Sequence, residues 1–184
     1  MARQALLVMD VQQAVLSRYP DTDYLPRLRT AIDAARARSV PVVYVVVGFR
    51  PGYPEVNARN KMFGGLAGAP RAAGAEQAMM IHPDVAPDER DIVVTKRRVS
   101  AFAGSDLDMV LRAGGIEELV LTGVATSGVV LSTLRQAADL DYGLTVLRDG
   151  CLDSDPQVHR VLVDKVFPQQ AEIMTVADWA AAAR

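Results

Sequence analysis

The sequence contains very few of the residues that build disulfide frameworks and metal centres. Its 184 residues include one cysteine, Cys151, so no internal disulfide can form, as in proteins of a reducing compartment. The two histidines, His82 and His159, lie far apart in the sequence and show no metal-ligand spacing. We therefore expect no metal site and no other cofactor.

Long apolar runs and an excess of charge are missing as well. No apolar run approaches the ~18 residues of a membrane-spanning helix, and residues 1–4 lead directly into a strand rather than into a signal peptide. The formal net charge is −2, and the densest basic cluster, residues 96–98, is too short for a nucleic-acid-binding arm. We expect a cytoplasmic protein that binds neither membranes nor nucleic acids.

Hydrophobic patterning predicts the fold. Half of the residues are hydrophobic and 23% are charged, which is typical of a globular chain, and the length fits a single domain over residues 1–184. Short apolar runs predict six buried strands, at 5–9, 42–47, 91–96, 119–121, 144–147 and 171–174. Helical spacing predicts helices over 25–35, 107–111, 130–138 and 158–166, with Thr175 capping a last one. This alternation predicts a three-layer α/β/α fold around a mostly parallel sheet.

The segment from residue 48 to residue 90 has no clear hydrophobic period and is rich in proline and glycine. A connection of this length in a compact domain is usually functional or mobile. We interpret it as a lid, or as a surface that contacts a partner, with short helical pieces inside it.

Charged side chains end two of the predicted strands. Asp10 comes directly after the first strand, and Lys96 ends the third. Parallel strands end along one crevice, where α/β proteins bind ligands, so we expect the two side chains to lie there together. Burial raises the pKa of a carboxyl group and a nearby ammonium lowers it, so Asp10 is a candidate general acid or base. A structural ion pair between strands is the alternative, and the sequence leaves both open.

A turn of small residues joins the strand at 119–121 to the next helix. Residues 123–128 read Gly-Val-Ala-Thr-Ser-Gly. Such a turn directs backbone N–H groups and the positive end of a helix toward the same crevice. It is a candidate ligand site, although small residues would equally allow tight packing of strand against helix.

Together these features resemble the isochorismatase-like cysteine hydrolases, a family that includes nicotinamidases, N-carbamoylsarcosine amidohydrolases and isochorismatases. The resemblance rests on Asp10, on Lys96 within Thr-Lys-Arg-Arg-Val-Ser-Ala-Phe, and on Gly-Val-Ala-Thr at 123–126, and it extends over about residues 4–178. It implies six parallel strands flanked by helices, with Asp10 and Lys96 as two members of a catalytic triad.

The resemblance also implies a cis peptide bond between Val124 and Ala125, which would form an oxyanion hole from N–H groups of the turn. The family's nucleophilic cysteine stands six residues after the motif glycine, and here that position is Val129. Valine cannot attack a carbonyl group, so a covalent thioester mechanism is excluded at this position. Ser127 and Ser132 have no evident base beside them, and we interpret Cys151 as a buried core thiol.

The chain also differs from the nicotinamidases, whose metal site resembles Asp-x-His after the second strand. Gly48-Phe49-Arg50 stands there instead. Arg50 suggests an anionic group in the pocket, or else an exposed loop residue. We expect His159 to pack against or cap its own helix, and His82 to be an ordinary loop residue.

Three functional hypotheses follow. The first is a small-molecule hydrolase that acts without a cysteine through Asp10 and Lys96, as isochorismatases hydrolyse vinyl ethers by protonation from an aspartic acid and capture of the cation by water. The second is a catalytically inactive family member that binds a small molecule or serves as a scaffold. The third is an amidase that uses Cys151, which requires an accessible thiol with a lowered pKa.

The residues expected to line the substrate pocket come from the start of the 48–90 segment, from the stretch after Lys96 and from the turn. They are Phe49, Arg50, Phe102, Val124, Ala125, Ser127, Gly128 and Val129. We also expect a homo-oligomer, a dimer or tetramer, because such folds resemble one another in completing a pocket with a neighbour's loop. The 48–90 segment supplies the adaptable side chains Tyr53, Met62, Phe63, Met79 and Met80 for that contact, or for a cover over its own core.

Overall fold

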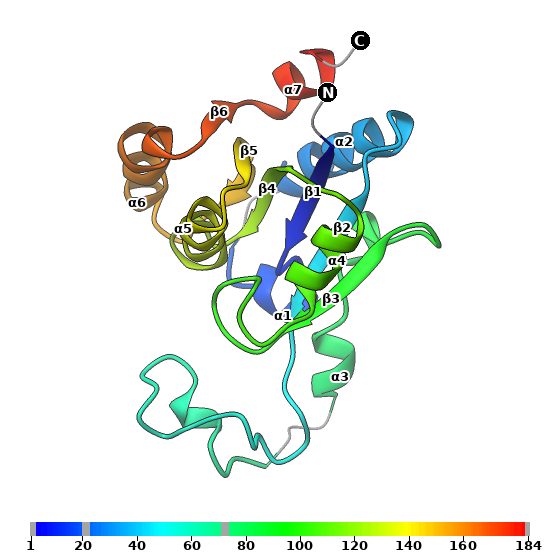
Figure 1. Ribbon diagram of the computed structural model, residues 1–184. Helices are drawn as coiled ribbons and strands as arrows, with labels where there is room; N and C mark the ends of the chain where they lie inside the picture. The colour runs from blue at the N-terminus through cyan, green and yellow to red at the C-terminus, as the bar shows by residue number, and fades with distance from the viewer. Residues whose placement is uncertain (1–2, 20–22, 71–73, 183–184) are drawn as a thin grey trace.

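A single sheet of six strands forms the centre of the protein (Figure 1). The computed structural model describes residues 3–19, 23–70 and 74–182. The strands are β1 (Gln4–Met9), β2 (Val42–Val47), β3 (Ile92–Lys96), β4 (Glu118–Val124), β5 (Gly143–Leu152) and β6 (Glu172–Met174). Their order across the sheet is β3-β2-β1-β4-β5-β6, and every neighbouring pair is parallel. The predicted six-stranded parallel sheet is confirmed.

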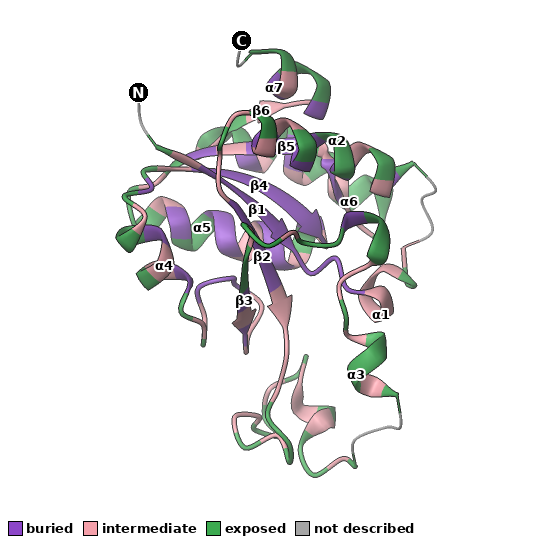
Figure 2. Ribbon diagram, turned by 90° about the vertical axis from the view of Figure 1, so that its right-hand side faces the viewer, coloured by how far each residue is buried: buried purple, intermediate pink, exposed green. Residues whose placement is uncertain are grey.

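The central strand β1 is apolar throughout because it packs against helices on both faces. Leu7 and Met9 join one core cluster, while Leu6 and Val8 join the other. Successive side chains of a strand point to opposite faces, so one continuous apolar run supplies both cores. Figure 2 shows β1 and β4 buried over most of their length.

Helices cover the two faces of this sheet and confirm the three-layer α/β/α fold. The helices α2 (Tyr24–Ala37) and α7 (Val176–Ala182) pack on one face, and α4 (Leu107–Ala113) and α5 (Leu131–Asp139) pack on the other. The shorter helical elements are α1 (Gln13–Leu16), η3 (Thr126–Val130), α6 (Pro156–Val161), η4 (Leu162–Val166) and η5 (Phe167–Gln169). As predicted, Thr175 caps the last helix, its hydroxyl oxygen accepting the N–H of Asp178 at 3.0 Å.

The segment after β2 projects from the edge at which the strands end (Figure 1). It holds the expected short helical pieces, η1 (Gly64–Leu66), α3 (Ala75–Ala78) and η2 (Pro83–Val85). Its return is fixed beside the end of β1, where Gln12 and Ile81 form an antiparallel bridge. The buried Gln12 amide donates to the carbonyls of Val47 at 3.0 Å and Met79 at 2.8 Å. Gln12 therefore ties both ends of the projecting segment to the strand that carries Asp10.

The strand ends approach each other closely at Gly123. Its φ is +144°, and a Cβ atom there would lie 2.4 Å from the carbonyl oxygen of Met9. Only glycine allows this contact, which brings the end of β4 against the end of β1. The register of β4 with β5 shifts between Leu121 and Gly123, so β5 extends to Leu152, five residues beyond the apolar run predicted as a strand.

Candidate active site

Asp10 and Lys96 meet at the carboxyl ends of the strands, as expected from the sequence. Lys96 Nζ lies 2.9 Å from Asp10 Oδ2, across the end of β2. Lys96 also donates to the carbonyl oxygen of Arg98 at 3.0 Å, which fixes its ammonium group. Asp10 has a φ of 56°, a region that non-glycine residues rarely adopt and that clusters at functional sites.

Both members of the pair are buried, and one carboxylate oxygen of Asp10 has no hydrogen-bond partner within the described residues. Asp10 is 7% exposed and Lys96 is 2% exposed. Asp10 Oδ1 is buried and has no hydrogen-bond partner within the described residues. Burial raises the pKa of Asp10 to about 6, because desolvation outweighs the charge and hydrogen bond of Lys96 and the backbone N–H of Val47, which all act to lower it. The carboxyl group therefore takes up and releases protons near neutral pH, which a general acid or base requires.

The turn after β4 has the unusual backbone that the resemblance implied. The peptide bond between Val124 and Ala125 is cis, and η3 contains Gly128 at φ −99° and ψ −105°, outside the helical region. The Ser127 N–H is already bound, because it donates to Asp153 Oδ2 at 2.7 Å. Val129 is 2% exposed and belongs to the core cluster beneath the turn.

Thr126, His159 and Asp153 form a second set of polar side chains at this turn, and none of the three was predicted from the sequence to be a site residue. Thr126 is fully buried, and a hydrogen bond of 2.8 Å joins its hydroxyl to Nδ1 of His159. Burial lowers the pKa of His159, which favours the neutral ring. Asp153 follows β5 as Asp10 follows β1, and that signal was hidden because the strand was predicted to end earlier. His159 thus packs against the turn after β4 in addition to lying on its own helix.

Tyr19 belongs to the same edge of the sheet. Its pKa is raised by burial, and the charges of Asp153 and Asp10 raise it further. The phenol therefore lies within electrostatic range of both carboxylates. Tyr19 was absent from the predicted site because it lies in the polar stretch after α1, where the sequence shows no strand end or motif.

The three side chains expected to line the pocket outside the turn make other contacts. The ring of Phe49 packs against Phe63 at 5.3 Å, and Arg50 is bound to Glu55 at 3.3 Å. Phe102 is buried, and its ring stacks at 6.1 Å on Tyr142. No hydrogen bond, ion pair or ring contact between described residues joins these three to Asp10 or Lys96. Their role in substrate binding stays a prediction.

The hydroxyl and thiol groups weighed as nucleophiles are not activated. Within residues 3–19, 23–70 and 74–182, no hydrogen bond connects the hydroxyl of Ser127 or Ser132 to a base. Cys151 is 4% exposed, and burial raises the pKa of its thiol to about 12. A nucleophilic cysteine needs an accessible thiol of lowered pKa, so the hypothesis of an amidase that acts through Cys151 is wrong.

An open hollow of about 850 Å³ lies at the edge of the sheet formed by β3. Its lining includes Arg50 and the two arginines that follow Lys96, but neither Asp10 nor Lys96. In the described part of the chain, no three histidine, cysteine or acidic side chains lie together as metal ligands would. None of the helices described there is both long and apolar enough to cross a lipid bilayer.

Comparison with known proteins agrees with this architecture. The model of the isochorismatase domain matches residues 4–178. The chain belongs to the isochorismatase family. It is 34% identical to the ureidoacrylate amidohydrolase RutB of Stutzerimonas stutzeri, over 94% of this chain and 75% of that protein.

Solved structures of isochorismatase-family proteins share the fold. An isochorismatase family protein from Burkholderia thailandensis superposes with a TM-score of 0.86 at 28% identity, covering 98% of this chain and 95% of that one. The N-carbamoylsarcosine amidase of Thermoplasma acidophilum gives a TM-score of 0.75 at 25% identity, covering 96% and 97%. By name the Stutzerimonas stutzeri relative is an amidohydrolase and the Thermoplasma acidophilum protein is an amidase, and a small-molecule substrate is consistent with membership of this family.

Proposed function

We propose that this isochorismatase-family chain hydrolyses a small molecule without a cysteine nucleophile, with Asp10 as general acid and base and Lys96 as electrostatic stabiliser. The observation that carries the proposal is the buried Asp10 carboxyl group, whose Oδ1 lacks a partner within the described residues and whose pKa lies at about 6. A buried acid with a spare oxygen at the ligand-binding edge of an α/β sheet is a candidate proton donor and acceptor.

Val129 supports a route in which no covalent intermediate forms on the turn. The resemblance places the family nucleophile at this position, and a buried valine offers neither a nucleophile nor a proton. A water molecule then has to supply the attacking oxygen. Asp10 would accept the proton of that water, or would first protonate the substrate and leave water to capture the resulting cation.

The pKa of Asp10 fits both roles. At pH 7 a carboxyl group with a pKa of about 6 is mostly ionised, and roughly one molecule in ten carries the proton. Lys96, held by Arg98, would stabilise the negative charge that develops on the substrate. We propose two substrate classes, vinyl ethers of the isochorismate type and small amides, since the relatives include an amidohydrolase and an amidase by name.

The second candidate function is a catalytically inactive family member that binds a small molecule or serves as a scaffold. The observation that favours it is the closed ion pair. Lys96 Nζ lies 2.9 Å from Asp10 Oδ2, and Val129, at the position of the family nucleophile, is buried in the core cluster. A pair that stays closed when a ligand binds would be structural.

Assays of vinyl ethers and small amides separate the two functions. They compare the wild type with Asp10→Asn and Val129→Cys, and Asp141→Asn is the matched control because Asp141 is exposed and shares the positive φ of Asp10. Turnover by the wild type and by Asp141→Asn that is lost in Asp10→Asn supports the hydrolase. Ligand binding without turnover in the wild type, with amidase activity gained by Val129→Cys, supports the inactive protein instead.

We propose further that the protein acts as a cytoplasmic homo-oligomer, a dimer or tetramer. Met62 and Met80 of the projecting segment are 67% and 54% exposed, and flexible apolar side chains of this kind suit a contact between copies. Light scattering with size-exclusion chromatography tests this, and Met62→Ser should shift the mass toward the monomer.

A further inference from the structure

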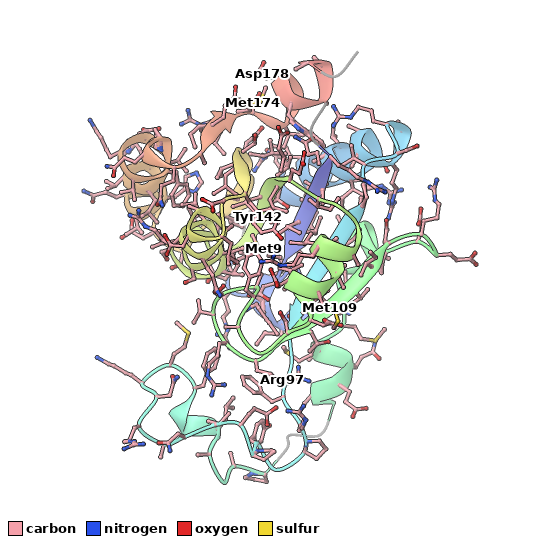
Figure 3. The ribbon with its side chains drawn as sticks, viewed as in Figure 1. Met9, Arg97, Met109, Tyr142, Met174 and Asp178 are labelled. Atoms are coloured by element: carbon pink, nitrogen blue, oxygen red, sulfur yellow. The ribbon has the colours of Figure 1, made fainter. Side chains whose placement is uncertain are left out.

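The hollow at the β3 edge combines an arginine cluster with exposed apolar side chains. We call it the arginine hollow, and its lining residues are Arg50, Glu55, Val93, Thr95, Arg97, Arg98, Gly104, Ser105, Asp106 and Met109. Figure 3 shows Arg97 between the end of the sheet and the projecting segment, with Met109 near it. The volume of about 850 Å³ is that of a small-molecule site.

One carboxylate of the protein already lies among the arginines. Glu55 Oε1 accepts from the N–H of Arg50 at 3.1 Å and from its Nη1 at 3.3 Å, and it lies 3.2 Å from Nε of Arg97. Burial acts to raise the pKa of Glu55, but its hydrogen bonds and the charges of Arg50 and Arg97 outweigh burial and lower it. The cluster therefore stabilises a carboxylate in its ionised form.

Glu55 satisfies this cluster incompletely. Its Oε2 is buried without a hydrogen-bond partner in the described residues, and Nε of Arg97 is buried and makes no hydrogen bond despite its short distance to Oε1. Two planar groups in bidentate contact would satisfy both atoms at once. The geometry at Glu55 falls short of that arrangement.

The arginines also have donors to spare. A guanidinium group carries five N–H bonds. The guanidinium group of Arg50 contacts Glu55 through Nη1 alone, and the side chain of Arg50 is 63% exposed. Arg97 uses Nη1 for the carbonyl of Gly48 at 2.9 Å, while its Nη2 has no partner in the described part of the chain. Arg98 donates to the backbone carbonyl oxygen of Glu55 rather than to its carboxylate, and this contact holds Glu55 in the lining of the hollow.

The apolar part of the lining is unusual for a surface. Val93, on the edge strand β3, is 50% exposed, and Met109, on α4, is 67% exposed. Both side chains line the hollow, and pockets that bind small molecules combine apolar side chains with a few polar groups. Next to the arginines they form a surface that is basic at one end and apolar at the other.

From these contacts we propose that the arginine hollow binds a small carboxylate with an apolar body, such as an aryl carboxylate. Its carboxylate group pairs with Arg50 and Arg97 in place of Glu55, and its apolar body covers Val93 and Met109. The proposal goes beyond the hydrolase activity, because the hollow does not include Asp10 or Lys96 and binding there requires no turnover.

Calorimetric titration with benzoate tests the site, with benzamide, benzenesulfonate and inorganic phosphate as comparisons. Benzoate should bind the wild type, and benzamide should not, because it lacks the charge. Arg97→Gln and Arg50→Gln should each weaken benzoate binding about tenfold, the effect of losing one charge-assisted contact. Glu55→Gln should strengthen it several-fold, because the competing carboxylate is gone. Arg90→Gln is the matched control, since Arg90 is exposed, pairs with Asp88 and lies outside the hollow.

Several outcomes overturn the proposal. Equal binding of benzamide would mean an apolar surface without an anion site, and phosphate that competes as well as benzoate would mean a simple anion site. Arg50 is largely exposed, so Arg50→Gln serves if Arg97→Gln fails to fold. Wild-type affinity in Arg50→Gln, or no gain in Glu55→Gln, contradicts the pairing. These binding results do not depend on whether the protein hydrolyses a substrate. The binding proposal and the proposed hydrolase function can therefore be refuted independently of each other.

Discussion

Asp10 should make the folded protein less stable as the pH rises, whereas most paired carboxylates make it more stable. The replacement Asp10→Asn should remove this pH dependence. Burial raises the pKa of Asp10 from 3.8 to about 6, so the folded protein binds this proton more tightly than the unfolded chain does. The stability contributed by Asp10 is therefore greatest below pH 3.8, where both states are protonated, and it falls as the pH rises to 6. Above pH 6 the loss is complete.

The magnitude follows from the shift of about 2 pKa units. At 1.36 kcal/mol per unit, this amounts to about 3 kcal/mol in all, of which about 2 kcal/mol is lost between pH 4 and pH 7. The free energy of unfolding of the wild type should fall by that amount relative to Asp10→Asn across this range. The constant cost of leaving Lys96 beside a neutral partner cancels in this comparison, because it does not vary over the same pH range.

Urea unfolding, followed by circular dichroism at intervals of half a pH unit, measures this difference. Asp141→Asn shows what the same substitution does at an exposed position of similar backbone conformation, and its curve should parallel that of the wild type. If the wild type instead gains stability relative to Asp10→Asn as the pH rises, Lys96 dominates and the carboxyl pKa is lowered. The pair would then be a structural salt bridge, and the proposed acid–base role of Asp10 would be refuted.

Three further substitutions test the contacts that build the site. Gln12→Ala should cost about 2–4 kcal/mol in the free energy of unfolding, because the buried amide makes three hydrogen bonds to backbone groups, and hydrogen exchange should speed up in the segment it holds. Thr126→Val should lower the free energy of unfolding by about 1–2 kcal/mol, because the hydrogen bond to His159 is lost. An NMR titration of the same variant shows whether the imidazole becomes more exposed, because the pKa of His159 should then rise. Gly123→Ala should prevent folding or cost more than about 3 kcal/mol in urea, whereas Gly65→Ala, where a Cβ meets nothing within 4 Å, should be nearly neutral.

The strands were predictable because burial on both faces leaves a continuous apolar run. This holds for β1 and β2, whose predicted limits differ from the structure by at most one residue. The apolar run does not predict the end of β5, because Arg148 and Asp149 interrupt the run although the strand continues through a register shift to Leu152. The same polar interruption hid Asp153, because no pattern of residues indicated that a strand ended there.

The pairing of Asp10 with Lys96 was predictable from topology alone. Parallel strands end at one edge, so side chains that follow β1 and β3 meet even though β2 lies between them. The contacts of Gln12 and Glu55 were not predictable. Both depend on the path of the segment after β2, which has no hydrophobic period, and on side-chain hydrogen bonds to backbone groups distant in sequence.

The two proposed sites share one physical feature. Among the described residues, the buried carboxylate oxygens that lack a hydrogen-bond partner are Asp10 Oδ1 and Glu55 Oε2. Carboxylates with a structural role are satisfied, as where Asp155 Oδ1 accepts two backbone N–H groups at the start of α6. A buried carboxylate oxygen left unsatisfied costs about 1–3 kcal/mol, so each of these two oxygens gains from a hydrogen-bond donor. Each of these carboxyl groups contacts a cation through its other oxygen, Asp10 with Lys96 and Glu55 with Arg50 and Arg97, which fits the proposals that a ligand completes each group.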